Sequence, residues 1–171
     1  MAAKEESIQL HSDIPTGPWT LYFHSHEETK WTLTSFVNIG TMKSWYQLWA
    51  IVDTLKTETF GEGMFFIMHD PSPPLWESHH HIRGGCYSFR CYKNDASNVF
   101  INYVIATLLN VVSTDKENQI NGISISPKRG FNIIKLWNSN SALYNKASNI
   151  VTLSSISEND IIYTPFVQKK M

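Results

Sequence analysis

Charged residues are scarce in this chain of 171 residues: they make up 17% of it, and the formal net charge is -1. A protein that follows a long stretch of nucleic-acid backbone needs an extended basic surface, so this balance argues against that class and restricts any RNA recognition to a local site. The sequence also lacks an apolar run long enough to span a membrane, and the residues after Met1 lack the apolar core of a signal peptide. We therefore expect a protein of the cytoplasm, with the nucleus as a second location, and no membrane or DNA partner.

Cysteine is rare too, with only Cys86 and Cys91. If both lie on one strand, their odd separation puts them on opposite faces, which disfavours a disulfide between them and predicts two reduced, structural thiols. With 42% hydrophobic residues, a chain of this length fits one domain with a sizeable core. The polar first part, which contains Pro15 and Gly17, predicts a flexible tail over residues 1–17 and a single domain over residues 18–171.

Aromatic residues, in contrast, are abundant at 13%, and they include six tryptophans. Alternating or continuous apolar residues predict strands at 19–23, 64–68, 85–91, 123–125, 133–137 and 161–167. Residues 33–39 are predicted to be extended or irregular. Strands separated mostly by loops, together with two amphipathic helices, predict an α+β fold with a largely antiparallel sheet.

Two helices follow from the spacing of apolar residues. Trp45, Leu48, Trp49 and Val52 stand at i, i+3, i+4 and i+7, which predicts a helix capped by Thr41 with both tryptophans in the core. A polar arc opposite an apolar one predicts a second helix over residues 99–114. A short third helix is predicted over residues 142–147.

The loop that starts with Pro71-Ser72-Pro73-Pro74 is the most informative stretch. Three prolines hold the backbone extended and remove amide donors, which predicts a stiff loop rather than a helix or a central strand. The loop then presents the wide aromatic face of Trp76 beside the carboxylate of Glu77. This pair suits guanine, whose N1–H and N2 amino group are adjacent donors for a carboxylate. The alternative interpretation is that Trp76 closes the loop onto the core and Glu77 is solvated.

Two further tryptophans do not fit the predicted core. Trp31 follows a polar loop, and Trp137 shares a strand face with Lys135. Two aromatic planes can hold one base between them, and a cationic base such as N7-methylguanine gains cation–π attraction as well. Lys128 and Arg129, in the predicted hairpin turn, would then meet phosphates attached to that base.

These residues resemble a known family. Pro74-Leu75-Trp76-Glu77, followed by Arg83-Gly84-Gly85, is similar to the translation initiation factor 4E family, whose members bind the 5′ cap of messenger RNA. The resemblance runs from about Trp19 to Val167. It implies a curved sheet with helices on the convex face and a cap-binding site on the concave face. By position, it implies that four residues contact the cap base: Trp31 and Trp76 as the sandwich, Glu77 at the guanine edge, and Trp137 beside the N7-methyl group.

The chain also departs from the family pattern. Relatives usually place an arginine and a tryptophan after the Arg-Gly-Gly triplet, where this chain has Cys86 and Tyr87. Arg83, Lys128, Arg129 and Lys135 are therefore the predicted contacts for the cap phosphates. On the convex side, the resemblance implies a docking surface for the helix of a scaffold-type initiation factor. Its predicted residues are Met42, Tyr46, Ile105 and Leu109.

Other functions remain as alternatives. His79-His80-His81 is a weak metal motif, because consecutive histidines on an extended chain diverge and no cysteine or carboxylate cluster completes a tetrahedral set. A cap or nucleotide hydrolase could use the same aromatic clamp with Glu27, Glu28 or Glu62 holding Mg²⁺. A peptide-binding module could use Trp76 as an anchor. We expect a non-enzymatic protein that binds capped mRNA and needs no cofactor.

Overall fold

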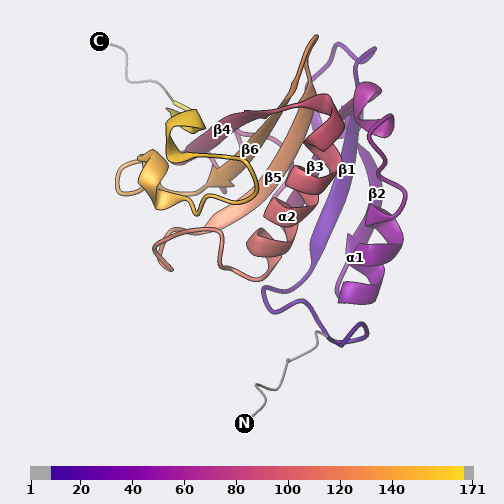
Figure 1. The fold of residues 1–171 in the computed structure, drawn as a ribbon, viewed down its shortest axis with the longest axis horizontal. Helices are drawn as coiled ribbons and strands as arrows, with labels where there is room; N and C mark the ends of the chain where they lie inside the picture. The colour runs from indigo at the N-terminus through magenta and orange to yellow at the C-terminus, as the bar shows by residue number, and fades with distance from the viewer. Residues whose placement is uncertain (1–8, 168–171) are drawn as a thin grey trace.

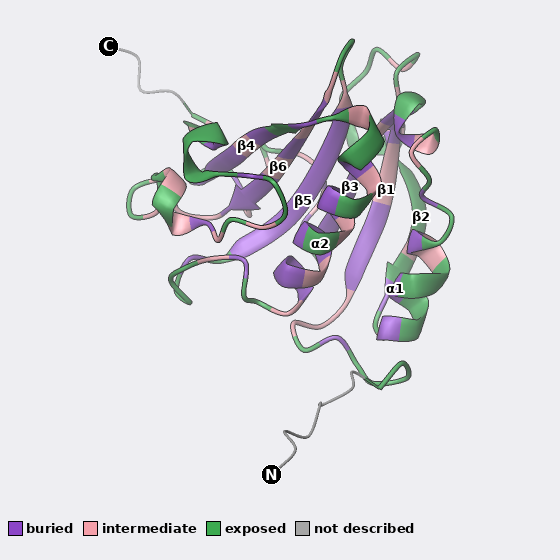
Figure 2. Ribbon diagram, viewed as in Figure 1, coloured by how far each residue is buried: buried purple, intermediate pink, exposed green. Residues whose placement is uncertain are grey.

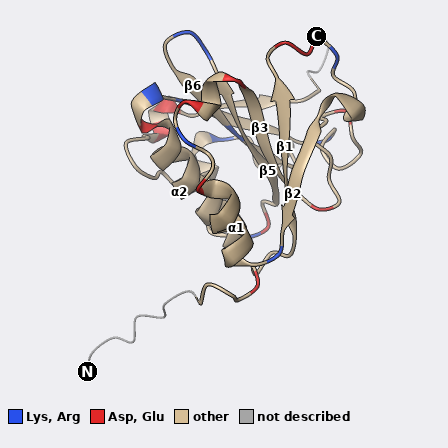
Figure 3. Cartoon of the chain, turned by 90° about the vertical axis from the view of Figure 1, so that its right-hand side faces the viewer, with Lys and Arg blue, Asp and Glu red and all other residues tan. Residues whose placement is uncertain are grey.

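The computed structural model describes residues 9–167. Within that range, seven strands form one antiparallel sheet in the order β2-β1-β3-β5-β6-β4-β7 (Figure 1). The strands are β1 (Trp19–Ser25), β2 (Val37–Met42), β3 (Gly63–His69), β4 (Gly85–Cys91), β5 (Ile120–Pro127), β6 (Asn132–Asn138) and β7 (Ile162–Pro165). The helices α1 (Trp45–Val52) and α2 (Ala96–Leu108) lie on the same, convex face of the curved sheet (Figure 3). The predicted α+β fold is confirmed.

The sheet is covered by apolar side chains on both faces, although only one face carries helices. In β3, Phe65 and Ile67 belong to the large core under the helices, while Phe66 and Met68 belong to a smaller cluster on the opposite face. Because successive side chains of a strand point to opposite faces, a strand buried on both sides must be apolar throughout. The continuous apolar run of β3 therefore reflects a second apolar surface on the concave face.

Helix α1 begins three residues later than predicted. Ser44, not Thr41, is its N-cap, because the Ser44 hydroxyl accepts a hydrogen bond from the Gln47 amide while the Gln47 side chain accepts one from the Ser44 amide. Thr41 instead pairs with Thr20 in the β1–β2 ladder. Trp45 is buried as predicted, but the prediction that Trp49 is buried is wrong, since 43% of Trp49 is exposed.

Helix α2 spans Ala96–Leu108 rather than residues 99–114. Its end is set by Asn110, which has a φ of 58°. The Asn110 amide donates to Thr107 O, and the Val111 amide donates to Ala106 O at 2.9 Å. This pair of bonds satisfies the last helical carbonyls and directs the chain away from the helix axis. The inner side of α2 is buried and its outer side is partly exposed (Figure 2).

Two other expectations need correction, and a third is confirmed. Residues 9–17 are not a loose tail, because Ile14 is buried and its amide donates to Lys43 O at 2.8 Å; residues 1–8 lie outside the described range. The segment over residues 33–39, predicted to be extended or irregular, contains a 3-10 turn at Leu33–Ser35 and the start of β2, which agrees with that prediction. No helix forms over residues 142–147 within the described chain, where a 3-10 turn occupies Ala147–Asn149 instead.

The two cysteines lie as predicted. Cys86 faces the concave cluster and Cys91 faces the core under the helices, and both are buried free thiols. In the part of the chain that the structure describes, no helix has the length and apolarity to cross a membrane.

Gly84 and Gly85 allow the start of β4 to approach its neighbours closely. A Cβ at Gly84 would lie 1.8 Å from the backbone oxygen of Asn138, and one at Gly85 would lie 2.4 Å from that of Thr164. These contacts are with backbone, so a side chain at either position would displace β6 or β7. The glycine pair therefore lets β4 pair closely with β6 and β7 directly after the proline-rich loop ends.

Candidate functional site

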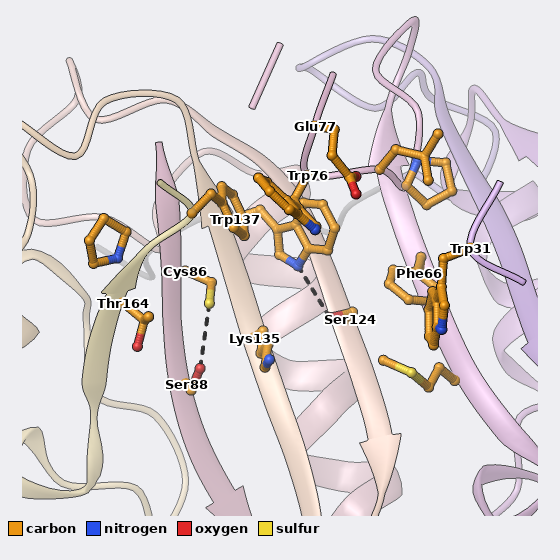
Figure 4. Close-up of a pocket in the computed structure, with 15 residues that line it drawn as sticks. Trp31, Phe66, Trp76, Glu77, Cys86, Ser88, Ser124, Lys135, Trp137 and Thr164 are labelled. Atoms are coloured by element: carbon orange, nitrogen blue, oxygen red, sulfur yellow. Dashed lines mark hydrogen bonds between the residues drawn. The ribbon is translucent and has the colours of Figure 1, made fainter. Parts of the chain in front are cut away.

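A cleft of about 390 Å³ lies on the face of the sheet opposite the helices (Figure 4). Its lining includes Trp31, Phe66, Trp76, Glu77, Cys86, Ser88, Ser124, Lys135, Trp137 and Phe166. Five of the predicted ligand-binding residues are among them, and they come from three separate parts of the chain. The structure thus brings both predicted sandwich tryptophans to one cavity.

Trp76 and Glu77 lie in the loop between β3 and β4. The segment from Pro71 to Gly84 forms successive turns rather than a strand, as its prolines predict. Trp76 is 42% exposed, so it does not close the loop onto the core. The Glu77 carboxylate points toward the space between Trp76 and Trp31 (Figure 4). The loop therefore presents an aromatic face and an acceptor on the same side.

Trp31 lies in the connection between β1 and β2, and 53% of it is exposed. One face of its indole stacks on the imidazole of His24, with ring centroids 3.9 Å apart and planes 6° from parallel. Phe36 meets the same indole at a centroid distance of 6.0 Å. A large apolar ring that is exposed on one side and supported on the other is suited to stacking on a ligand.

Trp137, in β6, is only 6% exposed and forms part of the floor of the cleft. Its indole N–H donates to the Ser124 hydroxyl at 3.2 Å (Figure 4). Phe66, His81 and Phe166 pack against its ring at centroid distances of 6.0, 5.2 and 5.2 Å. The orientation of Trp137 is therefore set by a hydrogen bond and three aromatic contacts.

Of the four predicted phosphate contacts, only Lys135 lines the cleft. It stands on the concave face of β6 opposite Ser88 of β4 and Ser124 of β5. Lys128 lines a smaller cavity on the other side of Trp31. Arg83 and Arg129 are solvent-exposed and line neither cavity. Lys135 is therefore the predicted phosphate contact that the structure places beside the aromatic residues.

The two departures after Gly84-Gly85 have different consequences. Cys86 lines the cleft, so the exchange of an arginine for a thiol removes a positive charge from the site itself. Tyr87 faces the opposite way, is fully buried, and donates its hydroxyl hydrogen to Tyr144 O at 2.7 Å. Burial raises the pKa of Tyr87 to about 12, so the hydroxyl stays protonated. Only the Cys86 exchange alters the cleft.

Sequence reasoning missed several residues of the site. Phe166 stacks on Trp76 with centroids 6.3 Å apart and planes 24° from parallel. Its position after the last strand gave no sign of this contact, because β7 reaches the cleft only through pairing with β4. Ser124 alternates with Ile123 and Ile125 in β5, so its place on the concave face could have been predicted from the strand period.

The convex face differs from its prediction, because only Tyr46 of the four predicted residues lines the groove there. Met42 is fully buried in the core, so its assignment to a partner-helix surface is wrong. Tyr46 is 52% exposed and lines a shallow groove with Leu10, Trp49 and Ile101. Ile105 and Leu109 are half-buried and do not line that groove.

The histidine triplet shows no metal-site geometry. Among residues 9–167, no group of three histidine, cysteine or carboxylate side chains is arranged to hold a metal ion. The His79 and His80 rings pack on each other with centroids 4.0 Å apart, while His81 points into the protein and is fully buried.

A curved sheet with helices on one face and an aromatic cleft on the other is the architecture of a binding protein whose cleft is suited to a flat ligand. The sequence profile of the Eukaryotic initiation factor 4E family matches residues 16–163. This chain belongs to that family.

Solved structures show the same fold. Ascaris suum eIF4E-3 in complex with an m7G cap is 13% identical, with a TM-score of 0.73 and 94% of each chain covered. A schistosome eIF4E bound to m7GpppA and 4E-BP is 15% identical, with a TM-score of 0.68, covering 79% of this chain and 75% of that one. C. elegans eIF4E-3 with the 4E-binding protein Mextli and a cap analogue is 11% identical, with a TM-score of 0.67 and coverages of 77% and 76%.

Proposed function

We propose that the cleft binds the N7-methylguanosine 5′ cap of messenger RNA and that the chain acts as a translation initiation factor. The observation that carries this proposal is that Trp31 and Trp76, from separate loops, line one cleft together with Glu77 and Trp137. Membership of the initiation factor 4E family supports it, as do the fold-level matches to proteins solved with caps.

The chemistry of the cleft fits a methylated guanine. Each indole face attracts a cation by roughly 0.5–2 kcal/mol when the contact is desolvated, and stacking adds roughly 1–3 kcal/mol per base. Methylation at N7 makes the base a cation and acidifies its N1–H. Glu77 can then accept from N1–H and the N2 amino group at once. Guanine without the methyl group keeps the hydrogen bonds but loses the charge.

Lys135 is the residue that we propose for the first contact with the cap phosphates. Lys135 stands opposite Ser88 of β4 and Ser124 of β5, and all three residues line the cleft together with Trp137. Lys128 does not line the cleft but lines the smaller cavity, which shares Trp31 and Met64 with it. One lysine in the cleft, where relatives also use an arginine, predicts a weak dependence of binding on salt.

We propose binding without turnover. A phosphate hydrolase brings several carboxylates together around a metal ion. Of the acidic residues between positions 9 and 167, only Glu77 lines the cleft, and it stands beside the aromatic rings rather than beside Lys135 (Figure 4). The cleft therefore offers recognition groups and no arrangement for Mg²⁺.

Titration with nucleotides tests this function directly. Quenching of tryptophan fluorescence by N7-methyl-GTP should show at least roughly tenfold tighter binding than GTP at the same salt, because only the methylated base gains cation–π attraction. The nucleotide should be recovered intact after incubation with Mg²⁺. Equal affinity for the two nucleotides would refute the proposal, and release of phosphate would favour the hydrolase.

We further propose that the groove around Tyr46 binds an amphipathic helix of a scaffold or repressor protein. Tyr46 and Trp49 stand one turn apart on α1, and both are about half exposed. Their rings lie with Leu10 and Ile101 in one apolar groove. Two relatives were solved with proteins of this class, Mextli and 4E-BP. Trp49 thus supplies exposed aromatic area on the turn after Tyr46.

Tyr46→Ala tests this surface. The variant should bind a fluorescently labelled 4E-BP peptide weaker by about 2 kcal/mol or more, because buried aromatic anchors dominate such interfaces. Anisotropy titration measures the change. Tyr92→Ala is the matched control, since Tyr92 is also exposed, at 76%, but does not line the groove. If the peptide binds both variants with the affinity of the parent protein, the groove is excluded as the peptide-binding site.

A further inference from the structure

Two buried histidines lie behind the aromatic cleft without lining it. His24, on β1, is 2% exposed, and His81, in the loop after Trp76, is fully buried. The sequence gives His24 no special mark and places His81 only in a weak metal motif, and histidine is a residue type of intermediate burial. Both histidines contact loops and indole rings that form the cleft, which distinguishes them from the other histidines discussed above.

Each histidine is hydrogen-bonded to a loop that carries a clamp tryptophan. The His24 Nε2 lies 2.8 Å from the oxygen of Lys30, the residue directly before Trp31. The His81 Nε2 lies 3.0 Å from the oxygen of Pro73, three residues before Trp76. A carbonyl oxygen only accepts, so Nε2 must carry the hydrogen in both rings. The two loops are thus each tied to a buried donor.

Each ring also packs on an indole of the cleft. His24 stacks in parallel on Trp31, and it lines the smaller cavity beyond Trp31 but not the cleft, so it supports the indole face that points away from the ligand. His81 meets the Trp137 ring at right angles, with planes 81° apart. An indole supported in this way loses little further freedom when a base stacks on it.

The state of His81 is consistent with this role. Its Nδ1 is buried and has no hydrogen-bond partner. Burial lowers the pKa of His81 to about 4, so the ring is neutral at neutral pH. A neutral ring puts no positive charge next to Trp137, where it would oppose a cationic base. A leucine here would fill the space but leave the Pro73 carbonyl without its donor.

We propose that His24 and His81 are positioning residues, which hold the two halves of the aromatic clamp in their binding geometry from outside the cleft. This inference rests on the proposed cap-binding function. It assigns to both histidines a role that requires an Nε2 donor and a ring, and no contact with the ligand.

His24→Ala and His81→Ala test the proposal, with His69→Ala as the matched control. His69 is half-buried and makes the same kinds of contact without lining the cleft or the smaller cavity: its Nε2 lies 2.6 Å from Thr16 O, and its ring packs on Trp19. We expect the two test variants to bind N7-methyl-GTP roughly 2- to 12-fold more weakly, which corresponds to reordering one side chain on binding. The control should keep the parent affinity even if its melting temperature falls.

The preference for N7-methyl-GTP over GTP separates positioning from general stability. A displaced indole loses more attraction for the cationic base than for the neutral one, so the ratio of the two affinities should fall in both test variants. Lower stability alone would leave this ratio unchanged in the folded protein. A parent-like affinity and ratio in both folded variants would overturn the inference. The same losses in His69→Ala would overturn it too.

Conservative variants keep the test decisive if an alanine variant does not fold. His81→Gln retains a donor near the position of Nε2 and should bind as the parent protein does, whereas His81→Leu retains bulk only and should bind more weakly. His24→Phe retains the stacked ring, and it should lose less affinity than His24→Gln. If His81→Gln binds no better than His81→Leu, and His24→Phe binds no better than His24→Gln, the donor role of His81 and the stacking role of His24 are contradicted. If the parent protein shows no preference for the methylated nucleotide, the proposed function itself has failed. If only the positioning inference fails, the parent protein still prefers the methylated nucleotide.

Discussion

Trp76→Ala should weaken binding of N7-methyl-GTP by roughly 2–4 kcal/mol, which is roughly 30- to 700-fold in Kd. The change removes one of two stacking faces and its share of the cation–π attraction. Because Trp76 is 42% exposed and stands in a loop, the fold should survive. Fluorescence of the remaining tryptophans measures binding, and circular dichroism measures folding.

Trp49→Ala is a matched control for this variant. Trp49 is 43% exposed, nearly the same as Trp76, but lies on α1 on the opposite face of the sheet. It should bind the nucleotide as the parent protein does. If Trp76→Ala does not fold, the alternative interpretation, that Trp76 closes the loop onto the core, would be correct instead.

Glu77→Gln should weaken binding of N7-methyl-GTP by roughly 1.5–3 kcal/mol, or roughly 10- to 150-fold. Glutamine keeps the size of the side chain, but it replaces one of the two carboxylate oxygens by an NH₂ group that faces the guanine donors. Calorimetric titration with N7-methyl-GTP measures the loss.

Two comparisons sharpen the Glu77 experiment. Glu58→Gln changes an exposed carboxylate that lines the groove on the convex face, and it should leave nucleotide binding unaltered. N7-methyl-ITP lacks the N2 amino group, so Glu77→Gln should reduce the affinity for N7-methyl-ITP less than it reduces the affinity for N7-methyl-GTP. A Glu77→Gln protein with parent affinity would show that another group reads the guanine edge.

Several errors in the predicted elements have local causes. The motif Ser44-x-x-Gln47 is a capping box, so the true start of α1 was readable. Trp49 stands at the edge of the apolar stripe that Trp45, Leu48 and Val52 define at about 100° per residue. Since α1 contacts β2 near the border of the sheet, that edge of the stripe is left uncovered. The spacing of apolar residues gives the direction of the apolar face of a helix. It does not say how much of that face the neighbouring elements will cover.

The end of α2 was misplaced for another reason. Asn110 fits the polar arc of a continuing helix and also the left-handed position that closes one. The structure has the second arrangement. Local sequence allowed both, and packing of the segment after Val111 against Ile150 and Val151 decided between them.

The sequence by itself determined the parts of this protein that depend on near neighbours. Prolines 71, 73 and 74 stiffen the loop that carries Trp76 and Glu77, alternation assigns Trp137 and Lys135 to one strand face, and the apolar run of β3 requires cover on both sides. These properties follow from backbone sterics and from the two-residue period of a strand, which act within a few residues.

Only the tertiary structure decided which of these residues meet. Trp31 lines the same cleft as Trp76 because β1 and β3 are adjacent in the sheet, although β2 and α1 lie between them in sequence. Pairing of β2 with β1 places Met42 in the core, and pairing of β4 with β6 brings Cys86 beside Trp137 and Lys135 in the cleft, where Lys135 is the cationic residue among those described. Strand order and register join distant segments through hydrogen bonds that no local pattern encodes.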